Sequence, residues 1–193
     1  MTPKYTPFAR AKGLLFGVTL LVCYANFLPS NAQQVGQILS QVDLGIQIEP
    51  QQTLEWCWVA SARMIATHYN RRVPPQCDML QQQYGAPCCS NPALCTVPGS
   101  IWQVQQLIGS FGLRYSQVSR PASPNEMLAL FNQGHPIVIH LVQGHFVVAS
   151  GMKMVVTPVG TLGIVHILDP FYGVQDISLP NLYSMWDAGL YVQ

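Results

Sequence analysis

The segment Gln51-Gln52-Thr53-Leu54-Glu55-Trp56-Cys57-Trp58-Val59-Ala60-Ser61 places a cysteine at the start of a predicted helix. Pro50 disfavours helix in the residue before it, and neither Gly nor Pro interrupts the apolar positions between 57 and 70. The positive end of the helix dipole favours a thiolate at such a position. Cys57 is therefore a candidate nucleophile, and a buried cysteine of the helix core is the alternative.

Further helices are predicted after this one, and strands after them. One helix covers 101–110, and another begins with the capping box of Ser123 and Glu126 and ends at Gly134. The pattern then changes to strands, at 136–142, 145–155, 161–168 and near 189–192. Helices followed by antiparallel strands predict an α+β fold.

The N-terminal residues have the layout of a signal peptide. Three basic residues in the first dozen precede an apolar run at 13–25, which is too short to span a bilayer comfortably. Small residues at Ser30 and Ala32 predict cleavage after Ala32, so 1–32 is interpreted as the signal peptide. An uncleaved membrane anchor is the alternative.

The remaining chain has the size of one domain. We interpret 33–48 as a short N-terminal extension or a first strand, and 49–193 as the folded domain. A net charge of +1, with only 9% charged residues, gives no electrostatic reason to expect a nucleic-acid partner. We expect a secreted or periplasmic monomer without stable membrane association.

The cysteine count depends on export. Of six cysteines, Cys23 leaves with the signal peptide, and four of the other five lie within 71–99, which we interpret as a loop. In an oxidising compartment these four predict two disulfides. Neighbouring Cα atoms are only ~3.8 Å apart, below the usual disulfide range of about 4.4–6.8 Å, so adjacent Cys88 and Cys89 do not pair. The remaining connectivities are Cys77–Cys88 with Cys89–Cys95, or Cys77–Cys89 with Cys88–Cys95.

A zinc site is the alternative for this cluster, but the spacing lacks the paired CxxC motifs of structural zinc sites. We therefore predict no metal and no cofactor. Cys57 is left as an unpaired thiol, and an unpaired thiol in a secreted protein needs an explanation.

His145 is the candidate base for this thiol. Gly144 precedes it and an apolar strand follows it, which puts its side chain at a loop edge that a substrate can reach. If 158–160 form the turn of the following hairpin, antiparallel partners have residue numbers that sum to 314 or 315. This register places His145 opposite Asp169 or Pro170, with Cβ atoms about 4.5–5.5 Å apart.

Asp169 is therefore the carboxylate predicted to orient the imidazole and to stabilise its charged form. A slip of one residue would move Asp169 to the other face of the sheet. Asp176 and Asp187 are the alternative carboxylates, and a structural Asp-Pro turn is the alternative role for Asp169.

The order Gln-x5-Cys-Trp, Gly-His-Phe-Val-Val, Asp-Pro resembles the papain-like cysteine peptidases. With the spacing of the clustered cysteines and the motif Asp-Pro-Phe-Tyr-Gly, the chain more narrowly resembles bacterial proteases related to a secreted effector protease of plant pathogens. Bacteriocin-processing peptidase domains are more distant relatives. The resemblance covers about 51–192 and implies a papain-like fold. It also implies Cys57 as nucleophile, His145 as base, Asp169 as third member, and Gln51, or else Gln52, as an oxyanion donor.

Two positions depart from the papain pattern: papain has Asn in place of Asp169, and small residues in place of Glu55-Trp56. Trp56 is either a core residue or a wall of the substrate site, and Gly144 is expected beside the substrate. The expected partner is a peptide or protein substrate. Acyl transfer or amide hydrolysis by the same triad is the second hypothesis, and a non-catalytic disulfide-bonded binding module is the third.

Overall fold

A computed structural model describes residues 36–118 and 121–193. The predicted signal peptide and its cleavage site lie outside the described residues. Within these residues no helix has both the length and the apolar composition needed to cross a membrane.

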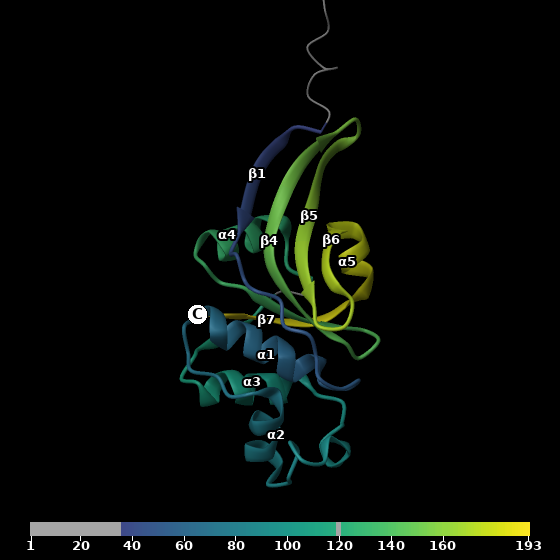
Figure 1. Ribbon diagram of the computed structural model, residues 1–193. Coiled ribbons are helices and arrows are strands. Elements are labelled where there is room, and N and C mark those ends of the chain that lie inside the picture. Colours follow the sequence, from purple (N-terminus) through teal and green to yellow (C-terminus); the bar gives the residue numbers. More distant parts are fainter. Residues whose placement is uncertain (1–35, 119–120) are drawn as a thin grey trace, which may run out of the picture. The chain divides into compact units, whose positions relative to one another are not determined.

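An antiparallel sheet forms the centre of the domain (Figure 1). The strand order is β2-β7-β3-β4-β5-β6, and β1 pairs with β4 beyond the end of β3. The strands are β1 (Ile38–Asp43), β2 (Tyr115–Gln117), β3 (Ile137–Leu141), β4 (Phe146–Thr157), β5 (Gly160–Asp169), β6 (Gly173–Ser178) and β7 (Trp186–Val192). The helices are α1 (Cys57–His68), α2 (Gln76–Tyr84), α3 (Ile101–Ser110), α4 (Pro124–Asn132) and α5 (Leu179–Met185), with a 3₁₀ turn at Pro92–Leu94.

Each face of the sheet packs against its own set of helices. Alternating residues of a strand point to opposite faces, and neighbours such as Ile137 and Val138 accordingly belong to two different core clusters. One cluster joins the sheet to α1, α2 and α3, and the other joins it to α4 and α5. Figure 1 shows α1–α3 gathered together, away from α4 and α5. The sheet is thus a two-sided scaffold.

Helix α1 is the central helix of the first cluster. Nine of its twelve residues are buried, which explains why its sequence is apolar almost all round rather than on one stripe. It ends where Asn70 adopts a positive φ of 55°, a left-handed conformation that Asn tolerates better than most residues. The predicted helix from Cys57 is confirmed, and so are the helices over 101–110 and after Ser123, each of which has its capping box.

The structure corrects the interpretation of 71–99 as a loop, because α2 lies within it. This helix buries only two large apolar side chains, Met79 and Leu80, so its periodic signal is weak. Pro75 before it and Gly85, with φ of 65°, after it are the start and stop signals that identify it. The strands β2 and β6 and the short helix α5 were not predicted. The segment 33–48 was interpreted as an N-terminal extension or a first strand, and the residues of β1 within it form a strand of the sheet.

Candidate active site

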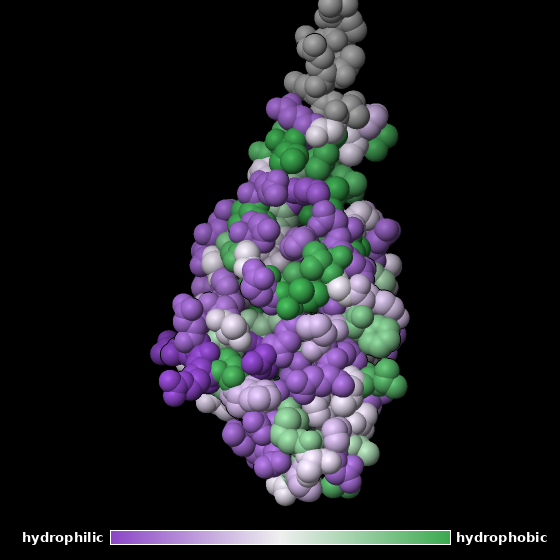
Figure 2. All heavy atoms as spheres, in the orientation of Figure 1, coloured by the Kyte–Doolittle hydropathy of each residue, from purple (hydrophilic) through white to green (hydrophobic). Residues whose placement is uncertain are grey.

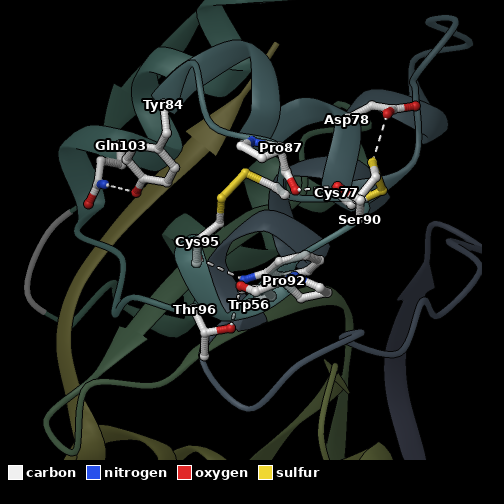
Figure 3. Close-up of a disulfide and its surroundings, with 12 residues drawn as sticks. Trp56, Cys77, Asp78, Tyr84, Pro87, Ser90, Pro92, Cys95, Thr96 and Gln103 are labelled. Atoms are coloured by element: carbon white, nitrogen blue, oxygen red, sulfur yellow. Dashed lines mark hydrogen bonds between the residues drawn. A yellow bond between two sulfur atoms is a disulfide. The ribbon is translucent and has the colours of Figure 1, made fainter.

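Cys57 is the first residue of α1 and is 5% exposed. It is the free cysteine of the described residues. Trp56 and Trp58 flank it, and both indoles are buried. The Trp56 Nε1–H donates to the Cys95 carbonyl at 3.0 Å (Figure 3), and the Trp58 Nε1–H donates to the Val97 carbonyl at 3.3 Å. These two bonds hold the thiol between fixed neighbours.

The four clustered cysteines form the disulfides Cys77–Cys89 and Cys88–Cys95. This is one of the two connectivities that the sequence left open, and its loops span twelve and seven residues. Cys77 and Cys89 lie beside Asp78 in an arrangement that resembles a metal-ligand group. Because a metal binds thiolates rather than a disulfide, the paired cysteines do not act as zinc ligands.

His145 lies between β3 and β4, and Asp169 is the last residue of β5. The His145 Nε2–H donates to Asp169 Oδ1 at 2.8 Å, and the same imidazole has Cys57 as a second hydrogen-bond partner. The Asp169 carboxyl group is buried and also accepts the backbone N–H groups of Phe171 and Tyr172, at 2.8 and 3.0 Å. The structure thus brings Cys57, His145 and Asp169 together.

The pKa values of His145 and Asp169 follow from this geometry. Burial acts to lower the pKa of His145, but hydrogen bonds to Asp169 and Cys57 and their negative charges outweigh it and raise the pKa to about 9. Burial acts to raise the pKa of Asp169, but the hydrogen bonds from His145, Tyr172 and Phe171 lower it overall. At neutral pH the imidazole is therefore protonated and the carboxyl group is ionised.

The predicted hairpin register was wrong, and a β-bulge explains why the His145–Asp169 contact forms nonetheless. A turn of 158–160 would pair residue 157 with residue 161, a sum of 318 rather than 314 or 315. In the structure the turn contains only Pro158 and Val159, and paired residue numbers sum to 317 from Thr157–Gly160 to Gly151–His166. Ser150 is then left unpaired, and the sum falls to 316. An even sum pairs odd-numbered residues of β4 with odd-numbered residues of β5, so these side chains lie on one face of the sheet. The numbers of His145 and Asp169 sum to 314 rather than 316, so the two side chains meet diagonally and not directly across the ladder.

Each alternative carboxylate has a histidine of its own. The His166 ring Nδ1 lies 2.9 Å from Asp176 Oδ1, and the His140 ring Nδ1 lies 2.8 Å from Asp187 Oδ2. Cys57 is the free cysteine of the described part of the chain, and the imidazole that it partners is that of His145.

The two candidate oxyanion glutamines lie in the segment before α1. The Gln51 Nε2 donates both amide hydrogens to loop carbonyls, those of Thr53 and Leu54, each at 2.7 Å. The Gln51 backbone N–H donates to the Pro170 carbonyl at 3.0 Å, which ties this segment to the residue after Asp169. Gln52 lines a hollow of about 370 Å³ to which Cys57 does not contribute.

Trp56 is a core residue rather than a substrate wall, because it is only 1% exposed and its indole N–H is already bonded. Gly144 is exposed in the turn before His145 and has φ of 83°, a conformation that favours glycine. Phe171 and Tyr172 are 51% and 71% exposed, and the Tyr172 ring packs edge-on to the His145 ring. The face of the domain in Figure 2 carries its apolar side chains in separate patches among polar ones.

The sequence did not identify Phe171 and Tyr172 as hydrogen-bond donors to Asp169. The motif Asp-Pro-x-x-Gly at 169–173 contains the signal, because an Asp side chain at the start of a turn commonly accepts backbone N–H groups a few residues further on.

Residues 38–184 match the family model described as papain-like cysteine protease AvrRpt2. The chain belongs to this family. Membership of the AvrRpt2 family makes the protein a papain-like cysteine protease, and the predicted enzyme class and papain-like α+β fold are confirmed. No curated protein sequence matches the chain.

A solved structure that resembles this AvrRpt2-family protease is the double glycine motif protease from an AMS/PCAT transporter, crystallised with a leader peptide. It is 18% identical, has a TM-score of 0.50, and the match covers 81% of this chain and 97% of that one. At this identity the likeness concerns the fold.

Proposed function

We propose that the protein is a secreted peptidase that cleaves peptide bonds with Cys57 as nucleophile, His145 as acid and base, and Asp169 as the orienting carboxylate. The observation that carries the proposal is the placement of His145 in hydrogen bonds to both Cys57 and Asp169. A thiol, an imidazole and a third group that orients it are the parts of an activated cysteine nucleophile.

In the proposed reaction, the Cys57 thiolate attacks the carbonyl carbon of the substrate and forms a tetrahedral oxyanion. The protonated His145 gives its proton to the leaving amine as the carbon–nitrogen bond breaks, which leaves a thioester on Cys57. Water then attacks the thioester while His145 takes a proton from it. Collapse of the second tetrahedral intermediate releases the carboxylic acid and restores the thiolate.

The start of α1 supports the oxyanion step. The first backbone N–H groups of a helix have no partner within the helix, and that of Cys57 lies beside the reacting sulfur. In the proposed role of Gln51, the oxyanion competes with the Thr53 and Leu54 carbonyls for an amide hydrogen. One such donor is typically worth about 10²–10³ in rate.

Export is the second part of the proposal. The N-terminal charge and apolar pattern support it, and so do two disulfides, since such bonds persist in oxidising compartments. N-terminal sequencing of the protein recovered from culture medium and periplasm tests it. A new N-terminus at Gln33 is expected, and an intact N-terminus in the membrane fraction would contradict it.

The activity is tested by digesting a peptide library with the folded, disulfide-intact protein and sequencing the products by mass spectrometry. We expect new termini from the wild type and none from Cys57→Ala. Product formation by Cys57→Ala would overturn the assignment of the nucleophile. With an added primary amine, capture of the acyl group in preference to water would identify a transferase instead.

A further inference from the structure

Gln76, the first residue of α2, is fully buried and makes all its side-chain hydrogen bonds to one short segment, residues 49–52. Its Nε2 donates to Glu49 Oε1 at 2.7 Å and to the Pro50 carbonyl at 2.9 Å. Its Oε1 accepts the backbone N–H of Gln52 at 3.1 Å. The Gln76 amide therefore binds the 49–52 segment through both its donor and its acceptor atoms.

The 49–52 segment also touches the site. The Gln51 backbone N–H bonds to Pro170, directly after Asp169, and the Gln51 side chain bonds to the turn that leads into α1. A displacement of this segment would move both the turn after Asp169 and the turn before Cys57. In Figure 1 the chain between β1 and α1 passes the end of β5 where β6 begins.

The network continues into two helices. The second carboxylate oxygen of Glu49 pairs with Arg63 of α1, whose Nε also donates to the Pro74 carbonyl at 2.8 Å. Cys77, the residue after Gln76, is held by its disulfide to Cys89. Buried polar groups are costly to leave unpaired, so these contacts favour a single arrangement of the 49–52 segment.

We infer that Gln76 is a positioning residue of the active site, which holds the 49–52 segment so that the turn before Cys57 and the turn after Asp169 keep their relative placement. This inference rests on the proposed function. Gln76 acts through the segment and does not contact the reacting atoms. Misplacement of catalytic groups by about 1 Å can cost roughly 10²-fold in rate.

Gln76→Glu tests the inference, because it keeps the shape and the acceptor but removes the donors and places a second carboxylate beside Glu49. We expect kcat per titratable Cys57 thiol to fall about 10–100-fold, with KM within about twofold. Titratable here means alkylated rapidly by iodoacetamide at pH 6, where an ordinary thiol with a pKa of about 8.5 reacts slowly, so that Cys57 thiols exposed by misfolding are not counted. Gln82→Glu, the same change at an exposed position of α2, is the matched control and should keep wild-type kcat.

The double variant Glu49→Gln/Gln76→Glu can restore the bond between these two side chains with donor and acceptor exchanged, but not the bond to the Pro50 carbonyl or the ion pair with Arg63. It should therefore recover part of the kcat lost in Gln76→Glu, so that the effects of the two single changes are not additive. Fewer titratable thiols with unchanged kcat per thiol, in the single or the double variant, would mean a purely structural role and would overturn the inference. Activity in Cys57→Ala would instead refute the proposed function, so the two failures are distinguishable.

Discussion

Two histidine–aspartate pairs each include one residue of β5, Asp169 or His166, and differ in what surrounds them. His145 and Asp169 meet at the end of the strand, whereas His166 and Asp176 are direct cross-strand partners on β5 and β6. The hydrogen-bond distances are nearly equal, 2.8 and 2.9 Å. Distance alone therefore does not distinguish a candidate active site from a surface contact.

Burial and the remaining partners do distinguish them. The Asp169 side chain is 8% exposed and accepts two backbone N–H groups, whereas Asp176 is 44% exposed and pairs with Lys153. Hydrogen bonds from Lys153 and His166 lower the pKa of Asp176, so this carboxylate is already balanced by a cation. Only His145 of the two histidines also bonds to a thiol. A buried carboxylate and a third reacting group are thus the informative features.

The largest expected difference between the pairs is in catalysis. His145→Ala should lower kcat/KM by about 10²–10⁴-fold, the usual contribution of a general acid–base group. His166→Ala should leave kcat/KM within about twofold, because His166 does not contact the thiol. Steady-state assays on a cleaved library peptide measure both, and equal losses in the two variants would remove the distinction.

A smaller effect is expected in the pH profile. The pKa of His145 is about 9, so kcat/KM should fall as the pH rises through about 9, when the proton for the leaving amine is lost. Asp169→Asn removes a negative charge that raises this pKa, so the alkaline limb should move to lower pH. Asp176→Asn is the control and should leave the limb in place. If the alkaline limb stays in place in Asp169→Asn, Asp169 does not raise the pKa of His145.

The smallest effect is expected in stability at the exposed pair. Asp176→Asn should change the free energy of unfolding by less than about 1 kcal/mol, because exposed ion pairs are well solvated and contribute little. Asp169→Asn should cost more, because it weakens the hydrogen bonds of a buried acceptor. Urea unfolding at neutral pH gives both values, and a larger loss in Asp176→Asn would reverse the comparison.

The elements with strong local signals were predictable from the sequence. Helices α3 and α4 have capping boxes at Ser100 and Ser123, and β4 and β5 are long apolar strands. Helix α2 was missed because Gln-rich turns with two buried apolar residues give little periodicity. The pairing of the four clustered cysteines stayed open, because both connectivities satisfy the separation of adjacent cysteines.

For the site, Cys57 and His145 were predicted from local context, and Asp169 from a hairpin register that was wrong. The contact of the three residues depends on features that sequence periodicity does not show. The bulge at Ser150 changes the register by one residue, and the neighbouring Gly151 is a local signal for it that the prediction did not use. The Gln76 network joins residues 24 to 27 positions apart through tertiary packing. Such contacts are set by the fold rather than by any local pattern.

The most direct test of the central claim is the rate at which iodoacetamide alkylates Cys57 at pH 6, followed by mass spectrometry of the disulfide-intact protein. An ordinary thiol has a pKa of about 8.5 and reacts slowly at this pH, whereas a thiolate paired with protonated His145 reacts quickly. We predict fast single alkylation at Cys57 in the wild type and in His166→Ala, and slow alkylation in His145→Ala. Equal rates in all three proteins, or an adduct elsewhere that survives Cys57→Ala, would contradict the proposed site.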